Sequence, residues 1–134
     1  MLTWSYLQKF NCTNPPNEVL PRTKEIQRNY DSFCKFLKEK NIKVSDHIIK
    51  TLDLTNKKIV FTDNTFPYNC EPNVVHKLLW IYKESIEIDN VQQIIEKKIL
   101  ELFNLKLEFI FYENKTCNKS IKDITHYHVF VLLK

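Results

Sequence analysis

Two histidines stand two residues apart in the apolar run that closes the chain, DITHYHVFVLLK (123–134). Side chains at that spacing on a β-strand point to the same face, so His126 and His128 should lie side by side. A third histidine, His76, stands in another apolar run, directly after a loop rich in proline and asparagine. Imidazoles gathered on one face of a sheet can bind an anion, move a proton, attack phosphorus or ligate a metal ion. These three histidines are therefore the candidate catalytic residues.

The composition is ordinary for a globular chain and excludes several classes of function. With 134 residues, 43% apolar and 27% charged, we expect a single domain over residues 1–134 with a core of its own. Glycine is absent, which excludes a P-loop and the glycine-rich dinucleotide fingerprint. The net charge of +4 comes from lysines interleaved with glutamates and not from a basic stripe, so the sequence gives no strong sign of a long nucleic acid as partner.

The pattern of apolar residues also bears on the location of the protein. No apolar stretch approaches the roughly 20 residues that cross a bilayer. The first residues show no basic segment followed by a long apolar one, as a secretory signal would. The expectation is an intracellular, cytoplasmic protein with no membrane partner.

Hydrophobic periodicity predicts an α+β fold. Helical spacing of apolar residues predicts helices over 23–41, from Ser45 onward, and over 90–104. Strands are predicted over 57–62, 74–83 and 106–112, and from Ile124 to the end. Strand pairs joined by loops of 8 to 11 residues favour one antiparallel sheet with amphipathic helices packed on one side. The first 22 residues, with three prolines, are expected to be irregular.

The loop DNTFPYNCEPN (63–73) is expected to close over the histidine face. Asn64 and Tyr68 bring hydrogen-bonding groups to it, while its two prolines limit its freedom at low entropic cost. Trp80 is in phase with His76 on the predicted strand, so its ring should wall the same face.

These segments together resemble a family of unknown function typified by the fungal N-acetylglucosamine-induced proteins. Its pattern is Asn-x-Phe-Pro-Tyr, then His and Trp on a strand, then an Asn-to-Ser loop and a final His-x-His-Val. The residues that match it are Asn64, Phe66, Pro67, Tyr68, His76, Trp80, Asn114, Ser120, His126, His128 and Val129. The similarity extends upstream to the segment around Arg22 and Tyr30, and so covers most of the chain.

The order of elements is also similar to that of the histidine-triad hydrolases, whose strand of alternating histidines holds the α-phosphate of a nucleotide. This resemblance implies a histidine-triad-like fold, with His128 as the nucleophile and Asn114 and Ser120 as phosphate ligands. Phe130 stands where the third histidine would be, and two extra residues separate Ser120 from the strand. His76 could supply the missing acid or phosphate-binding cation. Without such a group, binding could survive while turnover is lost.

The favoured prediction is a pocket that binds, and in its catalytic form hydrolyses or transfers, a phosphorylated small molecule or nucleotide. Tyr68 and Trp80 would stack on a base or sugar, and Asn64, Asn114, Ser120 and the histidines would read its polar groups. Two alternatives stay open. Three histidine nitrogens could bind Zn²⁺, the one cofactor that the pattern makes possible, although no metal ligand is assigned. The same side chains could instead form a non-catalytic surface for a protein partner.

Overall fold

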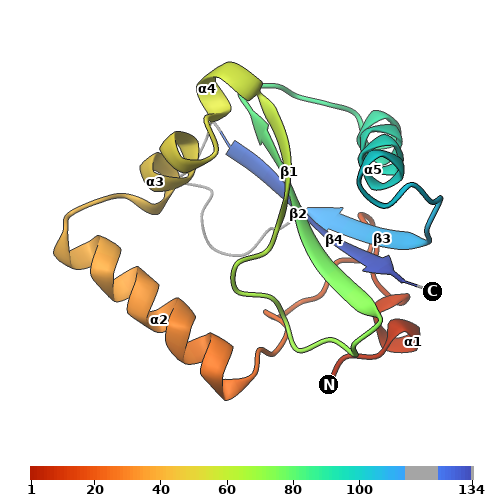
Figure 1. Cartoon of the computed structure of the whole chain (residues 1–134), viewed down its shortest axis with the longest axis horizontal. Helices are drawn as coiled ribbons and strands as arrows, with labels where there is room; N and C mark the ends of the chain where they lie inside the picture. The colour runs from red at the N-terminus through yellow and green to blue at the C-terminus, as the bar shows by residue number, and fades with distance from the viewer. Residues whose placement is uncertain (114–123, 134) are drawn as a thin grey trace.

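One four-stranded antiparallel sheet forms the centre of the computed structural model, which describes residues 1–113 and 124–133 (Figure 1). Its strands are β1 (Ile59–Asp63), β2 (Val74–Tyr82), β3 (Phe109–Glu113) and β4 (Ile124–Leu132). They lie in the order β1-β2-β4-β3, so the two longest strands occupy the centre. This confirms the predicted α+β class and the single antiparallel sheet.

The described residues form five helices, three of which the sequence predicts. Their bounds are α1 (Trp4–Leu7), α2 (Lys24–Glu39), α3 (Val44–Thr51), α4 (Leu54–Lys57) and α5 (Ile88–Phe103). The hydroxyl of Thr23 caps α2 by accepting the N–H of Ile26 at 3.2 Å. The short helices α1 and α4 were not predicted, because one turn leaves no helical periodicity to detect. Within the described ranges, none of the helices has the length and apolar character needed to cross a membrane.

Helices cover both faces of the sheet rather than one. The predicted packing on one side holds for α5, whose Val91, Ile95 and Ile99 are buried against the sheet. Leu7 of α1 and Leu54 of α4 are buried against the opposite face. The physical reason is that β2 and β4 carry apolar side chains on both faces, and these side chains need cover on both.

The pairing of β2 with β4 decides which side chains share a face. In this register His76 lies opposite Phe130, Leu78 opposite His128, and Trp80 opposite His126. All six therefore project from the face opposite α5, since side chains alternate along each strand. The prediction that the three strand histidines share one face is confirmed.

Turns that other proteins build with glycine are built here without it. Five residues have a positive φ between 54° and 66°: Asn41, Asp53, Lys58, Lys83 and Asn104. Asn104 ends α5 in the left-handed conformation, and its N–H donates to the carbonyl of Leu100 at 2.9 Å. Asparagine and aspartate tolerate this conformation better than other residues with a Cβ.

We expect the α5 face to provide much of the stability of the fold. Ile95 is fully buried in the cluster between α5 and the sheet, so Ile95→Ala should lower the free energy of unfolding by about 3 kcal/mol. Leu100 on the same helix is 54% exposed, and Leu100→Ala should cost less than about 0.5 kcal/mol. Urea denaturation of both variants measures the difference. Equal losses would contradict this packing.

Candidate functional site

A buried pair of imidazoles forms the centre of the histidine face. The Nε2 atom of His76 lies 2.8 Å from Nδ1 of His128, within hydrogen-bond distance. The two residues are only 5% and 4% exposed. They are diagonal neighbours on the two central strands, so the sheet register itself sets their separation.

The hydrogen-bond network fixes which nitrogen of each ring carries the proton. The backbone N–H of Tyr68 donates to Nδ1 of His76 at 3.1 Å, so that nitrogen is an acceptor. Neutral His76 must then carry its proton on Nε2 and donate it to Nδ1 of His128. His128 in turn keeps its proton on Nε2, which makes no hydrogen bond to the described residues. The chain thus ends in an oriented, neutral N–H donor.

Burial keeps all three imidazoles neutral near pH 7. It lowers the pKa of His76 to about 3, assisted by the charges of Arg22 and of His126. Burial alone lowers the pKa of His126 to about 4. The pKa of His128 lies well below its usual range, because of burial first and then of the neighbouring His76, His126 and Arg22. The cluster is therefore a set of polar but uncharged groups.

The loop between β1 and β2 closes over this pair, as predicted. The ring of Tyr68 lies 4.6 Å from the ring of His76 and 5.3 Å from that of His128, centroid to centroid. Asn64 shapes the loop, because its Oδ1 accepts the N–H of Phe66 at 2.9 Å. Its Nδ2 makes only long contacts, 3.4 Å, with both ring nitrogens of His76. Asn64 therefore acts mainly on the loop, and its contact with a ligand stays a prediction.

Two segments distant in the sequence hold that loop in place. The N–H of Leu2 donates to the carbonyl of Asn69, and the N–H of Glu71 donates to the carbonyl of Leu2. On the other side the ring of Phe66 packs 5.4 Å from Tyr30 and 5.3 Å from Phe33 of α2. The loop thus bridges the N-terminal segment and α2.

Arg22 is a site residue that our sequence reasoning did not select. Its Nε–H donates to the carbonyl of Phe66 at 2.8 Å. Its guanidinium carbon lies 4.5 Å from the ring centroid of Tyr30 and 5.0 Å from that of Tyr68. No local pattern distinguishes this arginine, because its partners come from α2 and from a loop more than 40 residues away.

His126 and Trp80 form the neighbouring part of the face. Their rings lie 4.6 Å apart, and the ring of His126 is 5.6 Å from that of His128. Trp80 lies on the histidine face and is buried in a cluster with Leu54 of α4. Its role as a wall of a ligand pocket stays a prediction. His126 is less buried than the other two strand histidines.

Two aromatic residues complete the environment of the histidine pair. Phe130, at the position of the missing third histidine, is fully buried and stacks 4.4 Å from the ring of His76. Tyr112 lies opposite His128 in the β3–β4 pairing. Its hydroxyl is buried and has no hydrogen-bond partner among the described residues. Sequence reasoning missed Tyr112, because only the β3–β4 register places it here.

The predicted phosphate ligands after β3 and the alternative of a zinc site at the histidines have different outcomes. Asn114 and Ser120 lie outside the described residues, so their predicted phosphate contacts stay predictions. Within residues 1–113 and 124–133, no group of three or more His, Cys, Asp or Glu side chains is arranged to hold a metal ion. The histidines fail to form one because His76 and His128 direct a nitrogen at each other.

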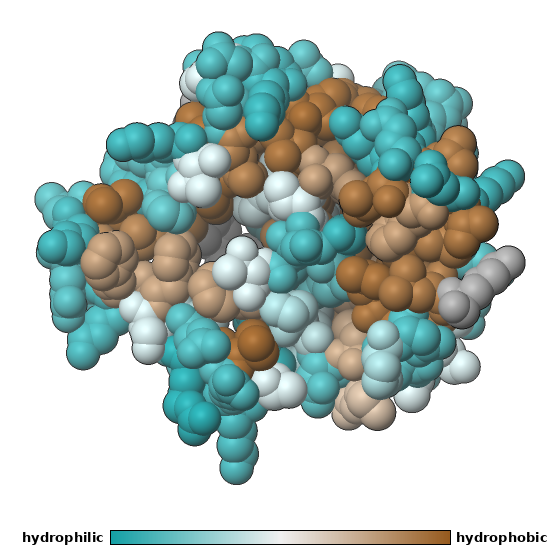
Figure 2. Space-filling model, viewed as in Figure 1, coloured by the Kyte–Doolittle hydropathy of each residue, from teal (hydrophilic) through white to brown (hydrophobic). Residues whose placement is uncertain are grey.

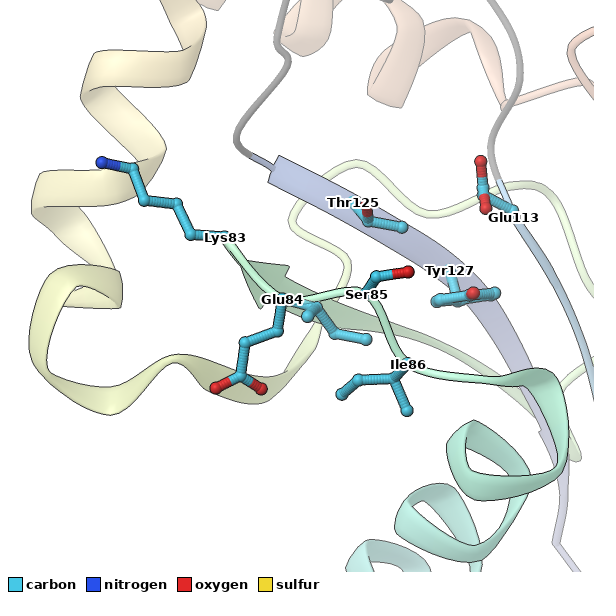
Figure 3. A pocket seen from close by; sticks show the side chains of 8 residues that line it. Lys83, Glu84, Ser85, Ile86, Glu113, Thr125 and Tyr127 are labelled. Carbon is cyan, nitrogen blue, oxygen red and sulfur yellow. The ribbon is translucent and has the colours of Figure 1, made fainter.

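A separate pocket of about 520 Å³ lies on the α5 side of the sheet (Figure 3). Ser85, Glu113, Thr125 and Tyr127 are among its lining residues. Burial and the adjacent Glu113 raise the pKa of Tyr127 to about 12. None of the predicted site residues lines this pocket, so it is distinct from the histidine cluster.

The fold and the site together define an α+β protein with a closed, neutral histidine cluster on one face of an antiparallel sheet. Residues 3–132 match the model of a protein family of unknown function, DUF3605, and the chain belongs to that family. Membership agrees with the expected family of unknown function. It confirms neither the N-acetylglucosamine-induced naming nor the similarity to histidine-triad hydrolases.

No curated protein matches the sequence. A solved structure titled "Crystal Structure of HTC1" is similar to this chain, with a TM-score of 0.63 and 15% sequence identity. The match covers 98% of this chain and 85% of that chain. At this identity the similarity shows a shared fold.

The buried histidines predict a loss of stability in acid. An unfolded chain protonates histidine near pH 6.5, whereas the folded pKa is about 3 for His76 and about 4 for His126, and is also lowered for His128. Below pH 6.5 the unfolded state therefore binds more protons, and the free energy of unfolding falls as pH falls. Three such groups give a slope of up to about 4 kcal/mol per pH unit.

Urea denaturation between about pH 7 and about pH 5 measures this slope. His126→Gln should flatten it by roughly a third, because one of the three titrating groups is removed. His47→Gln removes a histidine of α3 outside the cluster and is the matched control. A slope that is the same in wild type and His126→Gln would contradict the assignment.

Proposed function

We propose that the histidine face binds a phosphorylated small molecule or a nucleotide. The observation that carries the proposal is the chain of hydrogen bonds from the Tyr68 backbone through His76 to His128. It ends in the Nε2–H of His128, whose position is set by the two central strands. A donor held in this way suits an oxygen acceptor of a ligand.

The hydroxyl of Tyr112 supports the same proposal. A buried hydroxyl without a partner costs about 1–3 kcal/mol, and such groups in native proteins call for an explanation. Tyr112 lies directly opposite His128, and their ring centroids are 5.2 Å apart. A phosphate oxygen accepts from both an imidazole N–H and a phenol, so one ligand group would satisfy both donors.

The direction of the hydrogen bonds supports binding more strongly than hydrolysis. A nucleophilic imidazole needs a free lone pair on the attacking nitrogen and an acceptor for the proton on its other nitrogen. In His128, Nδ1 already accepts from His76, and Nε2 carries the proton. Attack would require both rings to reverse their tautomers, and His76 would then lose the hydrogen bond from Tyr68. The catalytic roles of His76, His126 and His128 remain predictions.

Tyr68 packs against both imidazoles, and an outward shift of residues 64–73 would uncover them for a ligand. The tyrosine ring would then be available to stack on a base or a sugar, beside the wall formed by Trp80. The zinc and protein-partner alternatives remain predictions.

Tyr112→Phe separates ligand binding from stability. Removing a buried hydroxyl without a partner should leave the melting temperature unchanged or higher, since the desolvation cost disappears. The same change should weaken binding of AMP about tenfold, because one hydrogen bond to a charged group is lost. Thermal denaturation and isothermal titration calorimetry measure the two effects, with adenosine as the ligand that lacks phosphate.

Tyr82→Phe is the matched control, because Tyr82 is a buried tyrosine of the same sheet face outside the pair. It should leave AMP affinity unchanged. A screen in which no mononucleotide, dinucleotide or sugar phosphate raises the melting temperature of the wild type would refute the proposed function.

A further inference from the structure

The guanidinium of Arg22 is held in a fixed position by contacts with a backbone carbonyl and two aromatic rings. Its Nε–H bonds to the Phe66 carbonyl, and the rings of Tyr30 and Tyr68 contact it. Arg22 is half-buried, and no Asp or Glu of the described ranges forms an ion pair with it. Within the described residues, this positive charge is thus ordered by aromatic and backbone contacts, with no carboxylate beside it.

The contacts of Arg22 with the described residues leave one edge of the guanidinium unused. The Nε–H is occupied by the Phe66 carbonyl, while the two terminal Nη groups have no hydrogen-bond partner within the described part of the chain. Those two groups lie at the end of a planar fork, and two parallel N–H bonds from it match two oxygens of a phosphate. Aromatic contacts suit arginine better than lysine, because guanidinium is planar and weakly hydrated.

Arg22 also lies close enough to act on the histidine pair. Its charge contributes to the lowered pKa of both His76 and His128. The ring of Tyr68 contacts the guanidinium and also stacks on the ring of His128. A phosphorylated ligand at the cluster would therefore find one permanent positive charge beside uncharged donors.

We propose that Arg22 binds the phosphate of the ligand end-on through its two Nη groups, and so sets the preference of this face for phosphomonoesters. The inference rests on the proposed function and names the residue that selects its ligands by charge. Figure 2 shows hydrophilic surface at the start of α2, and Arg22 stands two residues before that helix begins. Because Nε holds the loop carbonyl, phosphate binding and the position of the loop at residues 64–73 are coupled through one side chain.

Isothermal titration calorimetry with inorganic phosphate and with AMP tests this role. Arg22→Gln should weaken binding of both ligands at least about tenfold, and Arg22→Lys should recover only part of the loss, because a lysine keeps the charge but not the fork. Arg28→Gln, on the exposed side of α2, removes the same charge and should change affinity less than about twofold. Equal affinities in wild type and Arg22→Gln would overturn the inference and leave the proposed function standing. A wild-type protein that binds neither ligand would overturn both.

A second measurement does not depend on the folding of a variant. In the wild-type protein, ¹⁵N NMR of the arginine side chains follows the Nε and Nη signals during titration with inorganic phosphate. The signals of Arg22, assigned with Arg22→Lys, should shift while those of Arg28 stay in place. Saturable phosphate binding without a change at Arg22 would refute its role, whatever the behaviour of Arg22→Gln.

Discussion

The hydrogen bond between His76 and His128 is the constraint on which the site depends. It forms between two side chains buried on the central strands, and only one register of β2 against β4 brings them together. A slip of β4 by one residue would turn His128 toward α5, away from His76, and would turn the core residues of β4 toward the loop. Because both faces of β4 are covered, such a slip would misplace side chains on each face. The packing of the whole sheet therefore protects a single polar contact.

Neutrality of the cluster follows from the same burial. Three charged imidazoles beside Arg22 would repel one another in a poorly hydrated space, so the protein keeps the rings uncharged and the permanent charge at the edge. Hydrogen bonds replace the water that the rings lose, and the backbone of Tyr68 supplies the first donor. Polar groups that are all neutral can sit against Phe130 and Tyr112 at little electrostatic cost, which explains the aromatic walls around them.

Local patterns in the sequence predicted much of this arrangement. Alternation along 74–83 and from Ile124 onward gave the correct strands and placed three histidines on one face, because the period of a strand is a local property. The tautomers could not be predicted, since they depend on a backbone N–H delivered by a loop. Arg22 and Tyr112 were not predicted as site residues for a related reason. The position of Arg22 depends on a contact across more than 40 residues, and that of Tyr112 depends on the β3–β4 register. The sequence analysis predicted helices on one face of the sheet only, although continuous apolar runs such as those of the two central strands are typical of strands covered on both faces.

Because the chain contains no glycine, residues with a Cβ must adopt every positive φ that its turns require. Five residues with a Cβ have a positive φ, and two of them, Lys58 and Lys83, have no short polar side chain to ease that conformation. Lys58 comes directly before β1 and Lys83 directly after β2, at the same end of one hairpin. The chain thus carries conformational strain of about 1–2 kcal/mol at each lysine, and the antiparallel pairing between them must outweigh it. Substitution of either lysine by glycine would remove this strain from the hairpin. The stability of that edge of the sheet is therefore limited by the absence of glycine from the chain, and not by the geometry of the fold.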